Sequence, residues 1–264
     1  MTDKGLNLAW RQSLNKLAGL ISATEKESRA ILKTLRRIKD KSLALPVYQG
    51  KIGKTNIIHI ISGIGKTNAA HAATLLIEKF SPSAVINFGI GGAYPSANLR
   101  AGDIAIADRE IYGDEGLWLR DGFHKADAIG IPLLKKGRKK YFNEFPLDKN
   151  LMQKAVKFSG LVTRHSPLVT EVKSGAFVTV STATGTGRRA REIEKRFSAS
   201  GGAICENMEG AAVAHICAIY NIPMLEIRGI SNIVEDRNRD LWDIETAAEN
   251  CQKIILALIK EGRI

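Results

Sequence analysis

Short apolar runs alternate with helical patterns along most of the chain, and this alternation constrains the fold more than any other feature. The runs Leu17–Ala23, Ala84–Phe88 and Pro223–Arg228 have the composition of buried strands. Helical periodicity appears between and after such runs, at Lys66–Phe80, Leu147–Phe158, Met208–Tyr220 and Ile244–Ile259. We therefore predict an α/β protein, a single three-layer αβα domain built on a central mixed, twisted sheet.

Three further predictions concern the segments between these elements. Glu25–Lys39 has helical spacing and is predicted to form one helix. Val47–Gln49 and Asn56–Ile61 flank a turn-forming segment around Gly53, which is typical of a β-hairpin. Tyr112–Pro146 carries Gly, Pro and Asp, and we predict a long irregular loop or flap with a functional role.

The composition of the 264 residues is typical of a globular protein that needs neither disulfides nor a metal to fold. Cys205, Cys217 and Cys251 match no zinc motif and are predicted to be buried thiols. No apolar run approaches the ~20 residues of a membrane helix, and the N-terminus lacks a signal-peptide core. We expect a cytoplasmic protein that binds no membrane, with residues 1–16 as a polar extension and residues 17–264 as the domain.

The net charge of +12 is compatible with either a nucleic acid or an anionic small molecule as the partner. The densest basic clusters, Lys33–Lys41 and Lys135–Lys140, have little aromatic interleaving and are typical of solvated faces. We therefore expect a small anionic substrate and no nucleic acid.

Motifs for nucleotide phosphates, cofactors and metals are absent or incomplete. Gly53-Lys54-Thr55 and Gly65-Lys66-Thr67 both lack the earlier glycine of a P-loop. Neither Gly-x-Gly sequence has the third glycine of the dinucleotide fingerprint. The five histidines are scattered and form no His-Glu-x-x-His motif. The sequence predicts no cofactor and no metal site.

Acid and amide residues follow three of the predicted strands. Glu27 comes after the first strand, Glu209 opens a helix, and Asn232 follows the strand that ends at Arg228. A Gly-Gly turn, Gly91-Gly92, is predicted after a fourth strand. Because ligands of α/β sheets bind beyond the strand ends, these residues are candidates for one site.

In this order and spacing the residues resemble the nucleoside phosphorylase and nucleosidase superfamily, and within it the methylthioadenosine/S-adenosylhomocysteine nucleosidases. The shared features are the Glu-rich helix start Ser22–Glu27, the Gly-Gly turn, Met208-Glu209, and Ser231-Asn232 after Arg228. The resemblance covers roughly residues 17–262. It implies a nucleoside phosphorylase-like fold and a homodimer or larger homo-oligomer, often with a partner subunit closing the pocket.

Asn232 stands where the nucleosidases of that branch have an aspartate, and this narrows the resemblance to the futalosine hydrolases. Three other segments are similar to that family, namely Arg237–Trp242, Ile129–Asn143 and Asn207–Ala212. The resemblance implies hydrolysis of futalosine to hypoxanthine and dehypoxanthine futalosine, a step of menaquinone biosynthesis. The implied substrate is a purine nucleoside with an anionic 5′ extension.

The chemistry of N-glycoside cleavage suggests a role for each candidate. Glu209 would stabilise the positive charge that develops on the ribose, and Glu27 would orient and deprotonate water. Asn232 can donate to a 6-oxo group and accept from a protonated N7, which favours hypoxanthine over adenine. The predicted substrate-binding residues are Gly91, Gly92, Thr184, Met208, Ser231, Arg237 and Arg239, with the two arginines as partners of the benzoate.

Other interpretations stay open at this point. Taken singly, Glu27 and Glu209 fit helix-start charges, Asn232 fits a turn, and Trp242 fits a packing anchor. The alternative functions are a methylthioadenosine, S-adenosylhomocysteine or aminofutalosine nucleosidase, a purine nucleoside phosphorylase, and a nucleic-acid-binding module. Hydrolysis is favoured because Gly89–Ala93 has no Arg-x-Gly-Thr-like element for phosphate.

Overall fold

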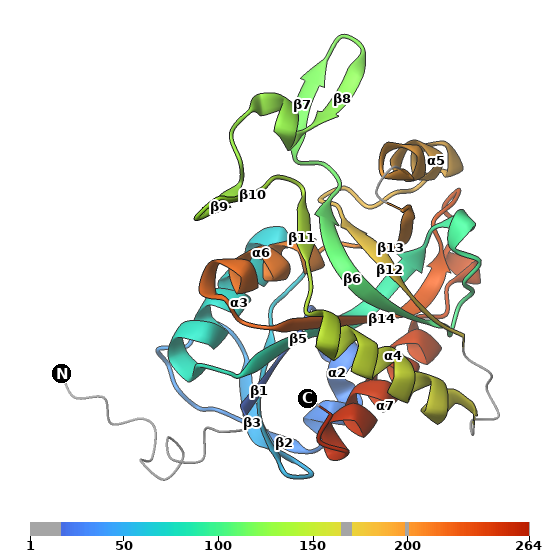
Figure 1. Ribbon diagram of the computed structural model, residues 1–264. Helices are drawn as coiled ribbons and strands as arrows, with labels where there is room; N and C mark the ends of the chain where they lie inside the picture. Colours follow the sequence, from blue (N-terminus) through green and yellow to red (C-terminus); the bar gives the residue numbers. More distant parts are fainter. Residues whose placement is uncertain (1–16, 165–170, 199–200, 264) are drawn as a thin grey trace.

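A mixed sheet of ten strands runs through the part of the chain that the computed structural model describes, residues 17–164, 171–198 and 201–263 (Figure 1). The predicted extension, residues 1–16, lies outside the described residues. The strand order is β11-β6-β12-β13-β5-β1-β4-β3-β2, and β14 pairs with both β5 and β6. The strands are β1 (Leu17–Ser22), β2 (Leu35–Arg37), β3 (Val47–Ile52), β4 (Thr55–Ile61), β5 (Ala84–Ala93), β6 (Ile104–Tyr112), β11 (Glu144–Pro146), β12 (Val172–Thr179), β13 (Ala203–Asn207) and β14 (Met224–Ile233).

Part of this sheet closes on itself. Strand β14 is parallel to β5 and antiparallel to β6, while β12 and β13 connect β6 back to β5. The closure brings the ends of β5, β13 and β14 together although they are far apart in the sequence. Side chains that follow these strands therefore meet at one place.

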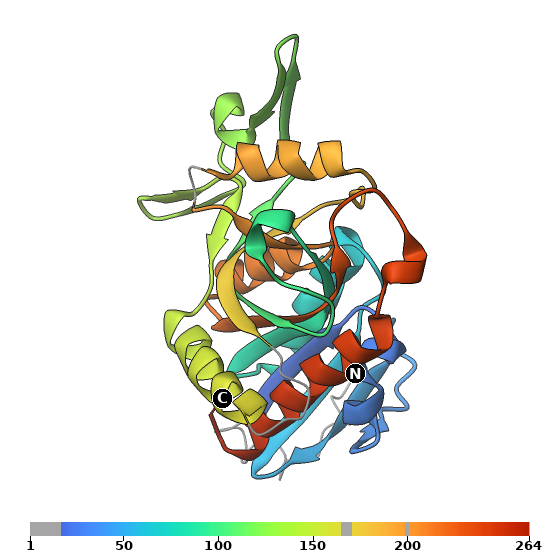
Figure 2. The ribbon, with the colours of Figure 1, turned by 90° about the vertical axis from the view of Figure 1, so that its right-hand side faces the viewer.

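Helices cover both faces of the sheet (Figures 1 and 2). Strand β1 explains why, because Leu17 and Ile21 pack into one apolar cluster while Ala18 and Leu20 pack into another. The first cluster includes α3 (Lys66–Phe80) and α6 (Gly210–Tyr220), and the second includes residues of α2 (Glu25–Leu32), α4 (Lys149–Arg164) and α7 (Ile244–Lys260). The shorter α5 (Gly187–Arg196) packs with β12 in a third cluster.

The predicted α/β class with a central mixed sheet is confirmed. Helix α3 has the predicted bounds, and the predicted hairpin around Gly53 is the antiparallel pair β3–β4. Cys205, Cys217 and Cys251 are free, buried thiols, as predicted.

The predicted helix Glu25–Lys39 is wrong in its second half. Helix α2 ends at Leu32, and Leu35–Arg37 forms strand β2 against β3. The hydroxyl and the N–H of Thr34 both bond to the carbonyl of Ile31, which ends the helix. The edge of β3 then supplies backbone partners that the helical spacing of the apolar residues does not reveal.

The predicted Gly91-Gly92 turn is also wrong, because both glycines lie inside strand β5. A Cβ atom at Gly91 would lie 2.5 Å from the sulfur of Cys205, and one at Gly92 would lie 2.7 Å from Cγ2 of Val234. The glycines therefore permit the close approach of β13 and of the chain after β14. They are required for strand packing and not for chain reversal.

The predicted irregular loop Tyr112–Pro146 contains short strands. These are the hairpins β7 (Gly116–Leu119)–β8 (Gly122–Lys125) and β9 (Leu134–Lys136)–β10 (Lys139–Tyr141), followed by β11. The first hairpin projects from the body at the top of Figure 1. Short 3₁₀ helices complete the fold at η2 (Pro95–Ala97), η3 (Ala126–Ile129) and η5 (Arg239–Leu241).

Candidate active site

A cleft of about 1020 Å³, counting the open solvent at its mouth, lies where β1, β5, β13 and β14 end. Every residue predicted for the site lines this cleft except Arg239. The residues predicted from the sequence that line it are Glu27, Gly91, Gly92, Thr184, Met208, Glu209, Ser231, Asn232 and Arg237. The fold thus brings the two carboxylates and the amide around a single cavity.

Glu27 is held in the first turn of α2 by a capping box. Thr24 is the N-cap, its hydroxyl accepts from the N–H of Glu27, and the Glu27 carboxylate accepts in return from the N–H of Thr24 at 2.8 Å. The Thr24 hydroxyl donates to the same carboxylate oxygen at 2.9 Å, and the N–H of Ile90 donates to the other at 3.0 Å. These bonds leave Oε1 with a free lone pair beside the cleft.

Glu27 is buried, and its surroundings pull its pKa in opposite directions. Burial raises the pKa above its ordinary value, and the nearby charge of Glu209 raises it further. The charge of Arg228 and the hydrogen bonds from Ile90 and Thr24 lower it. A carboxyl group with a raised pKa is a better base for water than an exposed one.

Glu209 precedes helix α6, occupies its N-cap position and is buried. Its Oε1 accepts from the N–H of Gly65 at 3.0 Å, and its Oε2 lies 3.3 Å from Nη1 of Arg228. Met208 also lies before the helix and not within it, since α6 begins at Gly210. Each oxygen of Glu209 keeps one lone pair, enough to accept from two neighbouring hydroxyl groups.

Arg228 lies behind the cleft, where it is hydrogen-bonded to Glu209 and close to Glu27. It is 1% exposed, and its Nη1 donates to Glu209 and to the carbonyl of Ile90. A Cβ atom at Gly89 would lie within 3.0 Å of both Arg228 Nη1 and Glu27 Oε1, so only glycine fits between them. Burial alone would lower the pKa of Arg228, but Glu226, Glu209 and Glu27 together raise it, and Arg228 is a permanent cation.

Asn232 has a fixed amide orientation. Its Nδ2 donates to the carbonyl of Ile233 at 2.9 Å, and its Oδ1 accepts from the hydroxyl of Ser231 at 2.8 Å. A carbonyl can only accept, so the amide nitrogen must face Ile233 and the oxygen must face Ser231. One N–H and one oxygen lone pair of Asn232 remain for a ligand.

Thr184 is hydrogen-bonded to the buried carboxylate of Glu206, which also lines the cleft. Its N–H and hydroxyl donate to the two oxygens of Glu206 at 2.9 Å and 2.7 Å, and Tyr94 donates to the same carboxylate. Burial and the charge of Glu206 raise the pKa of Tyr94 well above its ordinary value, so Tyr94 remains a donor.

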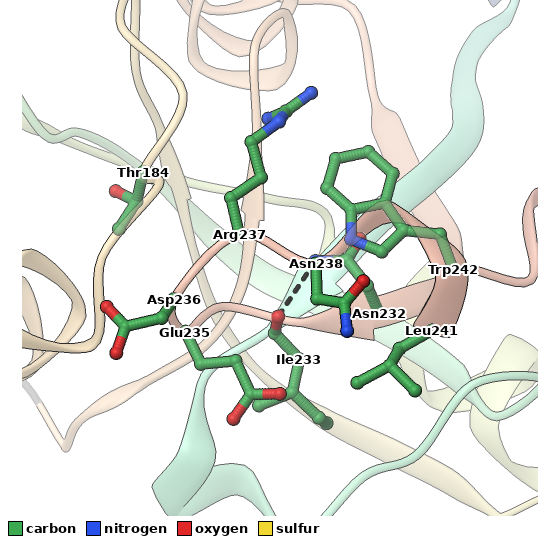
Figure 3. A pocket seen from close by; sticks show the side chains of 9 residues that line it. All are labelled: Thr184, Asn232, Ile233, Glu235, Asp236, Arg237, Asn238, Leu241 and Trp242. Atoms are coloured by element: carbon green, nitrogen blue, oxygen red, sulfur yellow. Dashed lines mark hydrogen bonds between the residues drawn. The ribbon is translucent and has the colours of Figure 1, made fainter.

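Arg237 lies at the same end of the cleft as Asn232. Its guanidinium lies over the ring of Trp242, 4.6 Å from the ring centre. Figure 3 shows both residues with Thr184 and Asn232 around a smaller side pocket, which has none of the carboxylates Glu27 and Glu209 in its lining. Arg239, which was also predicted for the site, lies exposed in η5 and lines neither the cleft nor the side pocket.

Sequence reasoning missed Glu206 as a wall residue and Arg228 as the link between the carboxylates. A signal for Arg228 was present, since a charged pair, Glu226 and Arg228, interrupts an otherwise apolar strand. Buried charges need partners, so such a pair points to a polar network. Glu206 had no comparable signal, because its partners Thr184 and Tyr94 are remote in sequence.

In the described ranges, no group of three or more His, Cys, Asp or Glu is arranged to hold a metal ion. In the same part of the chain, no helix is both long and apolar enough to cross a membrane.

The chain is similar in sequence to known proteins over most of its length. The family model described as "Phosphorylase superfamily" matches residues 18–260. A 5'-methylthioadenosine/S-adenosylhomocysteine nucleosidase of Maridesulfovibrio salexigens is 29% identical, over 92% of this chain and 98% of its own. A futalosine hydrolase of Thermus thermophilus is 28% identical, over 85% of this chain and 90% of its own.

Solved structures share the fold. The crystal structure of the Neisseria meningitidis 5'-methylthioadenosine/S-adenosylhomocysteine nucleosidase, in complex with methylthio-immucillin-A, superposes with a TM-score of 0.78. The match covers 93% of this chain and 99% of that one at 24% identity. The nucleoside phosphorylase-like fold that the sequence resemblance implied is therefore confirmed.

Proposed function

The chain belongs to the phosphorylase superfamily, and from this membership we propose that it is a nucleosidase that hydrolyses the N-glycosidic bond of futalosine, a 6-oxopurine nucleoside. The observation that carries the choice of substrate is the fixed amide of Asn232. Its free N–H can donate to O6 of hypoxanthine, and its free lone pair can accept from a protonated N7. An adenine would present its 6-amino group to that N–H and leave two donors facing each other.

The sugar lies beside Glu209 in this proposal. The two free lone pairs of Glu209 accept hydrogen bonds from the ribose hydroxyls. Its negative charge stabilises the positive charge that builds on the ribose as the bond breaks. Arg228 and the N–H of Gly65 hold the carboxylate in place before the substrate arrives. No reorganisation is then needed in the transition state.

Glu27 activates the water. The free lone pair of Oε1 accepts one water proton while the water oxygen attacks C1′ and the bond from C1′ to N9 breaks. The electron pair of that bond leaves with the purine, which takes up a proton from solvent at N7 next to Asn232, and Glu27 returns its proton to solvent after the reaction. The raised pKa of Glu27 supports its role as the proton acceptor.

The position of Arg237 changes its proposed role. It lines the side pocket with Asn232, Thr184 and Trp242, whereas Ile64 and Thr24 line only the main cleft. We therefore assign Arg237 to the base end. The anionic 5′ extension would leave the cleft past Ile64, which is 58% exposed at its mouth.

Hydrolysis is favoured over phosphorolysis by the charges of the lining. Among the described residues that line the cleft, only Arg237 carries a positive charge, and it lies at the base end. A phosphate beside the ribose would face the carboxylates Glu27 and Glu209. A carboxylate pair repels phosphate and suits water.

The second candidate is a methylthioadenosine/S-adenosylhomocysteine nucleosidase. It is favoured by the similarity of this chain to several 5'-methylthioadenosine/S-adenosylhomocysteine nucleosidases, including one at 29% identity. Both candidates cleave the same kind of bond with the same two carboxylates. They differ in the base, and therefore in what Asn232 must recognise.

The test is chromatography of the free base after incubation with futalosine, aminofutalosine, inosine or methylthioadenosine, with and without phosphate. We expect hypoxanthine from futalosine at a rate that phosphate does not change. Release of adenine from methylthioadenosine, with futalosine left intact, would replace this proposal by the second candidate. Turnover that requires phosphate would replace hydrolysis by phosphorolysis.

We also propose a homodimer or larger homo-oligomer. In the segment Tyr112–Pro146, Trp118 and Ile131 are each 71% exposed, and Leu119 is exposed as well. Such a concentration of exposed apolar side chains is typical of an interface. Sedimentation at several protein concentrations tests it, and a monomer throughout would refute it.

A further inference from the structure

Two carboxyl groups lie behind Arg228, outside the cleft. Glu226 lies on β14 two residues before Arg228, so both side chains are on the same face of the strand. Glu110 comes from the neighbouring strand β6. Both are 0% exposed, and neither lines the cleft. The reaction described above uses neither of them.

Glu226 binds one edge of the Arg228 guanidinium. Its Oε1 lies 3.0 Å from Nε and 2.9 Å from Nη2 of Arg228, and it also accepts from Asn87. These contacts fix the guanidinium plane and leave Nη1 to face Glu209 and the carbonyl of Ile90. Glu226 therefore sets the orientation of Arg228 toward Glu209.

The other oxygen of Glu226 is buried and receives no N–H or hydroxyl donor from the described residues. Glu110 approaches the first oxygen of Glu226. A Cβ atom at Gly210 would lie 2.0 Å from Oε1 of Glu110 and 2.5 Å from Oε1 of Glu226, so the two carboxyl groups converge on one point. A protonated Glu110 can donate to Glu226 at this point, whereas two ionised carboxylates there would repel each other.

The charges of the network require this proton. Arg228 is the one cation, and it already faces Glu27, Glu209 and Glu226. Burial raises the pKa of Glu110 well above its ordinary value, and the charge of Glu226 raises it further. The other titratable groups that face the pair are neutral, since burial also raises the pKa of Cys205, Cys217 and Tyr112.

Glu110 is held in place on its other side. Thr179 and Asn207 donate to its two oxygens, each at 2.7 Å. Asn207 in turn accepts from the N–H groups of Glu209 and Gly210 at the start of α6. The carboxyl pair is thus joined to Glu209 by two routes, through Arg228 and through Asn207.

We propose that Glu110 and Glu226 form a buried carboxyl–carboxylate pair that shares one proton, and that this pair positions Arg228 and, through it, Glu209. Both are positioning residues, since neither touches the substrate. The catalytic effect of positioning Glu209 rests on the proposed function, in which Glu209 stabilises the cationic sugar. The pair itself is a property of the fold.

Three variants test the positioning role by kinetics. We expect Glu226→Gln to lower kcat about 100-fold with a smaller change in KM, because a displaced Glu209 loses its interaction with the transition state. Glu110→Ala should also lower kcat, whereas Glu110→Gln should restore most of it because its amide can donate to Glu226. The matched control is Asp103→Asn, a buried acid outside the network, which should leave kcat unchanged.

Infrared spectroscopy tests the proton without any activity. At neutral pH the wild-type protein should show the C=O stretch of a buried protonated carboxyl group. This band should disappear in Glu110→Gln and persist in Asp103→Asn. If the protein cleaves none of the nucleosides, the proposed function fails while the band still reports on the pair.

Three outcomes would overturn the inference. One is the absence of a difference band between wild type and Glu110→Gln at neutral pH. Another is an unchanged kcat in a folded Glu226→Gln protein. The third is an equal loss of kcat in Asp103→Asn, because the effect would then belong to any buried acid.

Discussion

At the scale of one residue, the proposed function assigns to Asn232 the discrimination between purines. The carbonyl of Ile233 fixes its nitrogen on one side, and the hydroxyl of Ser231 fixes its oxygen on the other. An aspartate at this position would turn a carboxylate oxygen toward the Ile233 carbonyl and would have no N–H for O6. A single amide thus presents both a donor and an acceptor to the base, which an ionised carboxylate cannot do.

We predict that Asn232→Asp reverses the preference for the base. The ratio of kcat/KM for futalosine to that for aminofutalosine should fall by about 100-fold or more, because a buried 6-oxo group would face an acceptor. Steady-state kinetics with both nucleosides measures the ratio. Asn232→Ala is the control, and it should lower kcat/KM for both substrates without reversing their order. An unchanged ratio in Asn232→Asp would remove Asn232 from base recognition.

In the proposed function Glu209 stabilises the positive charge on the sugar, so a variant of Glu209 should lose activity and still fold. We predict that Glu209→Gln lowers kcat about 100- to 1,000-fold, because an uncharged amide cannot stabilise the cationic sugar. Glu245→Gln, which changes an exposed acid, should keep full activity. Thermal denaturation should give a folded Glu209→Gln protein with a cooperative transition. Near wild-type turnover in this variant would contradict the role.

At the scale of the element, the start of α2 serves both folding and the proposed chemistry. The spacing of Thr24 and Glu27 is that of a capping box, which normally stabilises a helix end at the surface. Here Glu27 is buried, and the same carboxylate that caps the helix also accepts from Ile90 beside the cleft. The helix end thereby fixes the direction of the candidate base.

We predict that Thr24→Ala destabilises the protein by about 1 kcal/mol and shifts its pH–rate profile. The hydrogen bonds from Thr24 lower the pKa of Glu27, so their loss raises that pKa. The acid limb of kcat/KM should therefore move to higher pH, since Glu27 must be ionised to accept a proton. Thr24→Ser should restore both stability and profile. A shift to lower pH would exclude Glu27 as the base.

At the scale of the whole molecule, a buried imidazole links stability to pH. His59 on β4 is 0% exposed and shares a hydrogen bond with Ser22, and its Nδ1 has no partner among the residues that the structure describes. Burial lowers its pKa to about 3, from an ordinary value of 6.5. The unfolded chain therefore binds a proton between these values that the folded protein does not bind.

We predict that His59 makes the protein acid-sensitive. Its contribution to the free energy of unfolding is complete above pH 6.5 and is lost as the pH falls toward 3, by up to about 4 kcal/mol. In His59→Phe this part of the pH dependence should disappear, while the stability above pH 6.5 changes less. Urea denaturation at a series of pH values measures both. Parallel pH curves for the two proteins would refute the linkage.

The sequence by itself determined the local features of this protein. The bounds of α3, the β3–β4 hairpin and the capping-box spacing all follow from residues close together in the chain. Glu27, Glu209 and Asn232 could be selected because each stands in a recognisable family pattern. The prediction that Asn232 follows its strand is wrong, because Asn232 lies inside β14. Periodicity and spacing suffice where the interacting groups are neighbours in sequence.

Only the tertiary structure decided the rest, because the deciding contacts join distant strands. Leu35–Arg37 is a strand since the edge of β3 pairs with it, and Gly91 lies in a strand since Cys205 packs against it. The network of Arg228 with Glu110 and Glu226 exists because β14 and β6 are neighbours. Burial and charge at such positions depend on which chain segments meet, and no local pattern encodes that.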